Sequence, residues 1–140
     1  MYIIDGDNMD KFVCANLALQ HFKNKKHTLE YEEFAGNKFE FRTYEVEVAV
    51  FEDDFHKAPN IKAIRVRLSD DEYLCLLQWQ LQNPQYGFNH YDIDTDAMIA
   101  IESKVEEVFF PDGNIGTYAV YLTEIRKDAE MILRSLNNEK

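Results

Sequence analysis

The sequence predicts an α+β fold in which a largely antiparallel sheet of about four strands packs with helices. One helical pattern is followed by three β patterns, then by two helical patterns, a fourth β pattern and a last helix (α-β-β-β-α-α-β-α). Strands that follow one another directly, instead of alternating with helices, favour antiparallel pairing. Apolar residues make up 46% of the 140 residues, which is enough for one core, so we expect residues 1–140 to form a single domain.

The first helix is expected over residues 9–24, where apolar side chains recur at spacings of three and four. The side chains on its expected core face are Phe12, Ala15, Leu19 and Phe22. Val13 and Leu17 lie on another side, so we expect the helix to be covered twice.

Residues 28–51 predict a β-hairpin that turns at Gly36-Asn37, because these residue types adopt the positive φ angles of a tight turn. Residues 61–68 predict the third strand, antiparallel to the second half of the hairpin. With Phe51 opposite Ile61, the charge and apolar patterns agree on one register. The expected pairs are Glu47 with Arg65, Glu45 with Arg67, Val46 with Val66 and Val48 with Ile64.

The hairpin places its apolar residues on two faces. With a two-residue turn, one face carries Leu29, Tyr31, Tyr44, Val46, Val48 and Val50. Phe34, Phe39 and Phe41 fall on the opposite face. Either a bulge near Arg42-Thr43 or a covering helix returns these phenylalanines to the core, or the hairpin tip presents them as a contact surface.

Three further helices follow the hairpin. Ser69 and Glu72 form a capping-box pattern that opens a helix. Pro84 follows the end of that helix. A fourth strand is expected over residues 115–123. The three helices are expected over residues 69–83, 94–109 and 124–137.

Trp79 lies off the apolar stripe of its helix, although an indole ring is costly to leave in water. The loop that follows carries Tyr86, Phe88 and Tyr91. We expect this loop to fold back over Trp79 and form a satellite cluster with a small pocket.

The net charge of −11 comes from 26 acidic and 15 basic residues, and it disfavours binding to phosphate-rich partners such as nucleic acids and anionic membranes. No apolar run reaches the 18 residues of a membrane span, and the start lacks a signal-peptide pattern. Cys14 and Cys75 are isolated, which is typical of neither a disulfide framework nor a zinc site. We therefore expect a cytoplasmic protein.

Residues 2–9, "YIIDGDNM", place an apolar run before Asp5. From Tyr2 to Asn8 this stretch resembles the first strand of PIN-like and NYN-type ribonucleases, which implies a metal-dependent nuclease that uses Asp5. Asp70 and Asp71 would supply a second acidic site. The alternative interpretation is a tail that leads into a helix cap, since two β-runs and a turn separate these sites instead of the βαβ units that such a fold needs.

Acidic residues also alternate along the expected strands, at Glu30, Glu32, Glu45 and Glu47. Such a row could imitate a nucleic-acid backbone and act as a decoy for a DNA-binding protein. Arg65 and Arg67 neutralise part of the row if the expected register forms.

The sequence contains no HExxH, phosphate-binding glycine loop or Gly-x-Ser-x-Gly motif, so we expect no catalysis, no cofactor and no metal ion. The function that the sequence favours is a small acidic interaction module. We expect its partner to be another protein or a second copy of the chain, bound through a sheet face or through the hairpin tip that carries Phe34, Phe39 and Phe41. The nuclease based on Asp5 and the acidic decoy are the alternatives.

Overall fold

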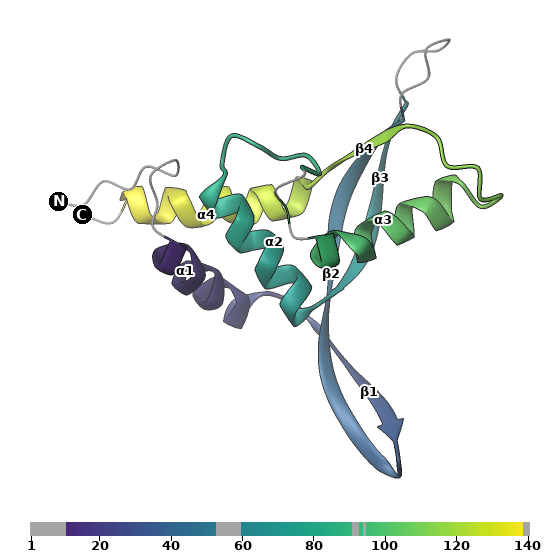
Figure 1. Ribbon diagram of the computed structural model, residues 1–140. Coiled ribbons are helices and arrows are strands. Elements are labelled where there is room, and N and C mark those ends of the chain that lie inside the picture. Colours follow the sequence, from purple (N-terminus) through teal and green to yellow (C-terminus); the bar gives the residue numbers. More distant parts are fainter. Residues whose placement is uncertain (1–10, 53–59, 91–92, 94, 139–140) are drawn as a thin grey trace.

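The computed structural model describes residues 11–52, 60–90, 93 and 95–138, and it confirms the expected order of elements (Figure 1). The helices are α1 (Lys11–Asn24), α2 (Asp70–Gln82), α3 (Thr95–Phe109) and α4 (Thr123–Asn138). The strands are β1 (Thr28–Phe34), β2 (Asn37–Glu52), β3 (Asn60–Ser69) and β4 (Tyr118–Tyr121). None of the described helices combines the length and the apolar character that crossing a bilayer requires.

The long strand β2 is the centre of an antiparallel sheet. β3 pairs with β2 from Thr43 to Glu52 along one edge. The other edge of β2 is shared, since β1 pairs up to Thr43 and β4 pairs from Ala49 onward. The predicted register of β2 and β3 is confirmed, including the pairs Glu47 with Arg65 and Glu45 with Arg67.

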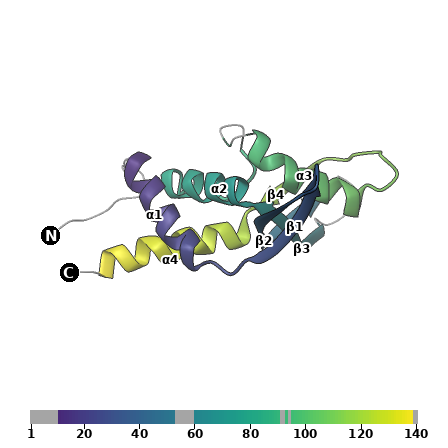
Figure 2. The same cartoon turned by 90° about the horizontal axis from the view of Figure 1, so that it is seen from below.

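The core lies between the helices and one face of the part of the sheet in which β2 pairs with β3. Val46, Val48 and Leu68 are fully buried on this face, while Arg65 and Arg67 of the other face are exposed. α2 contacts α1, α3, α4, β2 and β3, so it is surrounded by other elements. Figure 2 shows α1, α2 and α4 gathered at one end of the molecule and α3 beside the strands toward the other. The capping box of Ser69 and Glu72 is present at the start of α2, as predicted.

The predicted core face of α1 is wrong in part. Phe12 is 79% exposed and Leu19 also faces solvent, whereas Phe22 packs against the core as predicted. Cys14 and Ala18 are fully buried, and with Phe22 they form a ridge at spacings of four. Small side chains at a contact allow two helices to approach closely, and α1 lies against α2.

The hairpin turn lies one residue earlier than predicted. Phe34 pairs with Asn37, so the turn residues are Ala35 and Gly36, with φ angles of 53° and 80°. Positive φ at both positions is the requirement of a type I′ turn. Pairing across the hairpin shifts by two residues, and since side chains alternate with a period of two, the predicted faces are unchanged.

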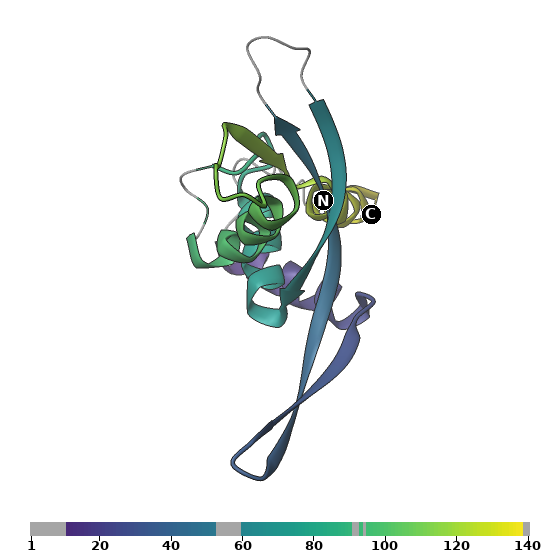
Figure 3. The same ribbon diagram turned by 90° about the vertical axis from the view of Figure 1, so that its right-hand side faces the viewer.

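The first part of the hairpin extends beyond the described helices as a two-stranded ribbon. Pairing runs without a bulge from Thr28–Thr43 to Phe34–Asn37, and β3 ends where Ser69 meets Thr43. We call residues 28–42 the hairpin arm. Figure 3 shows the sheet nearly edge-on, with the arm projecting past the helices.

Candidate functional site

The hairpin arm carries the three phenylalanines away from the core. Their side chains are exposed by 73% at Phe34, 53% at Phe39 and 39% at Phe41. Across the ribbon, Glu32 lies opposite Phe39 and Glu30 lies opposite Phe41. This face of the arm therefore interleaves aromatic rings with carboxylates.

The other face of the arm is also apolar in part. Leu29 and Tyr31 are exposed there, and the ammonium of Lys38 lies 4.5 Å from the centre of the Tyr31 ring. Apolar side chains that gather on a surface, rather than lying singly, are typical of interaction sites. Both faces of the arm are thus suited to contact with another macromolecule.

A stack of aromatic rings fixes the arm where it enters the core. Tyr44 follows the arm directly, is fully buried and stacks on Tyr73 of α2 with 5.1 Å between ring centres. Phe22 of α1 and His27 lie 5.3 and 5.9 Å from the same Tyr44 ring. The base of the arm is therefore packed between α1 and α2.

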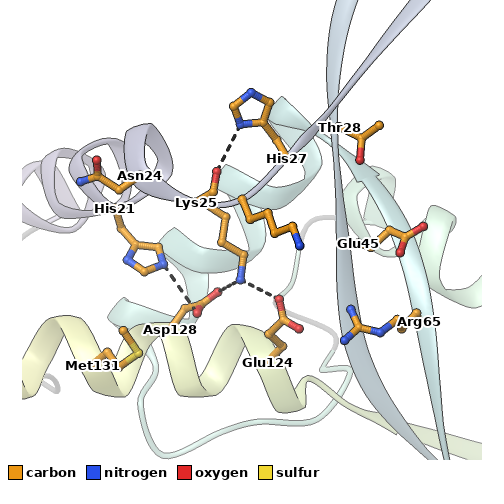
Figure 4. A pocket seen from close by; sticks show the side chains of 11 residues that line it. His21, Asn24, Lys25, His27, Thr28, Glu45, Arg65, Glu124, Asp128 and Met131 are labelled. Atoms are coloured by element: carbon orange, nitrogen blue, oxygen red, sulfur yellow. Dashed lines mark hydrogen bonds and ion pairs between the residues drawn. The ribbon is translucent and has the colours of Figure 1, made fainter.

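A charged cluster joins the segment between α1 and β1 to α4, as Figure 4 shows, and also includes a side chain of α2. The ammonium of Lys25 donates to Glu124 Oε2 at 2.6 Å and to Asp128 Oδ2 at 2.9 Å. The buried hydroxyl of Tyr73 donates to the same Asp128 oxygen at 2.8 Å. We call Lys25, Tyr73, Glu124 and Asp128 the anchor cluster. Lys25 lies three residues before β1 begins, so its contacts hold the chain in place where it enters the arm.

The electrostatics of the anchor cluster keep both donors protonated. Burial, and then the nearby charge of Asp128, raises the pKa of the Tyr73 hydroxyl above its ordinary value. Burial alone would lower the pKa of Lys25, but hydrogen bonds to Glu124 and Asp128 outweigh it and the pKa is raised. Lys25 is therefore a cation and Tyr73 a neutral donor at physiological pH.

Glu124 also closes a gap in the sheet. β1 ends its pairing with β2 at Thr43 and β4 begins at Ala49, which leaves part of this edge of β2 without a strand. The backbone N–H of Glu47 lies in that gap and donates to Glu124 Oε1 at 3.2 Å. A side-chain carboxylate thus replaces a neighbouring strand.

The anchor cluster borders a cavity of about 490 Å³ between α1, α4 and the sheet (Figure 4). His21 Nε2 lies 3.5 Å from Asp128 Oδ1, and the ring of His27 lies 3.2 Å from the carbonyl oxygen of Lys25 through Nδ1. The ammonium of Lys25 is already neutralised by two carboxylates. The contacts at this side of the cavity form an ion-pair network between α4 and the segment before β1.

The loop after α2 brings aromatic rings to Trp79. Trp79 is only 7% exposed, and its ring lies 6.3 Å from His90, which stacks on Tyr86 at 4.7 Å. Phe88 packs on Tyr121 at 4.9 Å and on Phe51. Tyr91 lies outside the described residues.

The side chain of Gln80 holds the loop after α2 in this position. Its amide donates to the carbonyl oxygens of Tyr86 and, at 3.1 Å, of Asn83. Gln80 is fully buried, and these bonds satisfy its amide nitrogen, although its Oε1 accepts no hydrogen bond from the described residues.

The residues of the nuclease interpretation are not brought together in the described part of the chain. Asp5 lies outside the described residues, while Asp70 and Asp71 form the first turn of α2. The described strands pair only antiparallel, unlike the parallel strands that the resemblance implies. Within the described ranges, no three His, Cys, Asp or Glu side chains form a group that could hold a metal ion.

The acidic row is partly neutralised. Arg67 lies between two of its members, with Nη1 at 2.7 Å from Glu30 and Nη2 at 3.9 Å from Glu45. Part of the predicted carboxylate row is therefore paired with cations.

The anchor cluster was missed by sequence reasoning. Lys25 lies 99 residues from Glu124 and 103 from Asp128 along the chain, and no motif joins such distant positions. One signal was present, because Asp128 falls inside the apolar stripe that Ile125, Ala129 and Ile132 form on the last helix. A carboxylate inside a core stripe indicates a buried partner.

Comparison of the chain with family models, with curated proteins and with solved structures finds no match.

Proposed function

We propose that the protein is a non-catalytic interaction module that binds another protein through the hairpin arm. The observation that carries this proposal is the exposure of Phe34, Phe39 and Phe41 on a ribbon whose base is fixed. Burying one such side chain fully contributes about 1.5 to 3 kcal/mol. Aromatic side chains also dominate the binding energy of many interfaces.

The lone ribbon itself supports this proposal. A two-stranded hairpin is at best marginally stable in water unless a further strand or a helix packs on it. In the hairpin arm, the apolar side chains of both faces lack such a cover from the described residues. A bound protein would supply it.

Charge narrows the class of partner. The chain carries −11 overall, and Glu30 and Glu32 flank the phenylalanines of the arm, so nucleic acid is disfavoured as a direct ligand. The partner surface that fits is apolar and places cationic or neutral side chains directly opposite the carboxylates of the arm.

A reducing compartment such as the cytoplasm suits this module. No disulfide joins Cys14 to Cys75, and Cys14 lies in the buried core cluster against which Cys75 packs. The lack of a disulfide framework is usual where glutathione keeps cysteines reduced.

The test uses the full chain immobilised as bait for proteins of its source cell. Phe39→Ser is compared with Ile61→Ser, which removes an exposed apolar side chain on β3, outside the arm. The proposal expects specific proteins, or further copies of the bait, to be retained by the wild type and by Ile61→Ser but lost with Phe39→Ser. Equal retention by all three baits would overturn it.

A further inference from the structure

One edge of the hairpin arm offers free backbone groups. β1 covers one edge of β2 from Asn37 to Arg42, but β3 reaches only to Thr43 on the other edge. Along residues 37–42, the described chain therefore leaves this second edge of β2 unpaired. Unpaired N–H and C=O groups on such an edge are a template for another strand.

The turn determines which residues face that edge. Phe34 and Asn37 flank a two-residue turn and form a hydrogen-bonded pair, and such pairs alternate along an antiparallel ladder. Odd-numbered residues of β2 therefore bond toward β1, and Lys38, Glu40 and Arg42 direct their backbone groups to the free edge. The N–H of Glu47, which donates to Glu124 on the β1 side, follows the same alternation.

We propose that a second copy of this chain occupies the free edge, so that two arms pair antiparallel about a two-fold axis at Phe39. This inference rests on the proposed function and names the partner of the same arm. Lys38 of each copy then lies opposite Glu40 of the other, which gives two opposite-charge pairs. Phe39 lies opposite Phe39 of the second copy as a cross-strand aromatic pair.

Repulsion between like charges excludes the two registers in which the two-fold axis is moved by one residue from Phe39. An axis at Lys38 would place the two Lys38 side chains directly opposite each other. An axis at Glu40 would do the same for the two Glu40 side chains, and would also oppose Lys38 to Arg42. Like charges directly opposite each other destabilise a strand pair.

The length of the free edge excludes the next register. An axis at Phe41 would place the second arm beside Thr43, where Ser69 of β3 already pairs. With the axis at Phe39, the second copy ends its pairing at Gly36 opposite Arg42, and the overlap fills the free edge without reaching β3.

The resulting ribbon has four strands and one shared aromatic face. Because a two-fold axis perpendicular to the ribbon keeps each residue on its own face, Phe34, Phe39 and Phe41 of both copies lie together. Four strands with an apolar face have the extra packing that a lone two-stranded hairpin lacks.

The first experiment is sedimentation velocity of the full chain over a series of concentrations. The wild type is expected to show a monomer–dimer equilibrium. Lys38→Glu and Glu40→Lys are each expected to weaken the dimer by about tenfold or more, because each opposes like charges twice. The double variant Lys38→Glu/Glu40→Lys restores opposite pairs and should recover the dimer.

Arg42→Glu is the matched control. It changes the net charge by the same amount as Lys38→Glu, but in the proposed register Arg42 lies opposite Gly36. A dimer that survives Arg42→Glu and fails with Lys38→Glu supports the register. Failure of the double variant to recover the dimer would overturn it.

The second experiment is cross-linking through Phe39→Cys. At a non-hydrogen-bonded pair, the two Cα atoms lie about 4.5 Å apart, which suits a disulfide. Under mild oxidation, Phe39→Cys should give a covalent dimer, while Lys38→Cys and the wild type should not. A covalent dimer with Lys38→Cys in place of Phe39→Cys would contradict the two-fold axis at Phe39.

The two proposals can fail separately. A wild type that stays monomeric at every concentration overturns pairing with a second copy. If Phe39→Ser still loses a different protein that the wild type retains, the proposed function stands with another partner.

Discussion

At the residue scale, Asp128 is the centre of the anchor cluster, because it accepts hydrogen bonds from Lys25 and Tyr73 through one oxygen. The free-energy contribution of such a buried pair depends on both partners being present. Removing one of them leaves an uncompensated charge or an unsatisfied donor, which costs more than the pair contributes.

Asp128→Ala is therefore expected to lower the free energy of unfolding by about 3 to 5 kcal/mol. The control is Glu130→Ala on the same helix, where an exposed pair with Arg126 at 3.3 Å is removed and a change below about 0.5 kcal/mol is expected. Urea denaturation of both variants gives the comparison. Equal losses in the two variants would show that the anchor cluster does not stabilise the fold.

Tyr73 and Lys25 make stability depend on alkaline pH. Both pKa values are raised in the folded protein, so the unfolded chain releases these protons first. Their contribution is complete below about pH 10, near the ordinary pKa values, and is lost as pH rises toward the folded values. Tyr73 lowers the free energy of unfolding by at most about 1.4 kcal/mol per pH unit in that window, and Lys25, which is only half-buried, contributes less because solvent screens its charge.

Urea denaturation between about pH 9 and pH 11 tests this dependence. Tyr73→Phe, which cannot ionise at this position, should make the decline with pH shallower than in the wild type. A decline of the same steepness in both proteins would contradict the assignment to Tyr73.

At the element scale, the sequence predicted the element order, the capping box of α2 and the register of β2 with β3. These features depend on local caps and on alternation between adjacent strands, which a sequence displays directly. The face of α1 was predicted only in part, since Phe22 packs on the core but Cys14 and Ala18 are buried in place of Phe12 and Leu19. The anchor cluster could not be predicted, because its members meet only in the folded chain.

A substitution in the turn of the hairpin arm tests how far the turn limits the stability of the arm. Ala35 has a φ of 53°, a region that costs a residue with a Cβ about 1 to 2 kcal/mol, while asparagine tolerates it better. Ala35→Asn is expected to stabilise the arm. Amide hydrogen exchange of residues 28–42 should become about threefold to tenfold slower, with little change in α2.

Ala63→Gly serves as a control that is expected to lower the free energy of unfolding, where Ala35→Asn is expected to raise the stability of the arm. This exposed alanine lies inside β3, where glycine is expected to destabilise by about 0.5 to 1 kcal/mol. Faster exchange in the arm of Ala35→Asn would show that its turn is not of type I′.

At the scale of the whole molecule, the net charge of −11 opposes the approach of a second copy. In the proposed dimer, the paired arms hold the helical parts of the two copies apart. The repulsion acts over about 30 Å at 0.01 M salt but over about 8 Å at 0.15 M. We therefore expect the dimer fraction in sedimentation equilibrium to rise between these two salt concentrations. A fall in that fraction would show that attraction between opposite charges, such as Lys38 and Glu40, controls the association.

We infer that the aromatic residues of the arm serve contact and not the core. The deciding measurement is the free energy of unfolding of Phe39→Ser, determined by urea denaturation at the lowest usable protein concentration. Val46→Ser provides the core reference, since Val46 is fully buried. We predict a change below about 0.5 kcal/mol for Phe39→Ser, as for other surface substitutions. A loss of about 3 to 5 kcal/mol, the scale of a phenylalanine removed from a packed core, would contradict the claim.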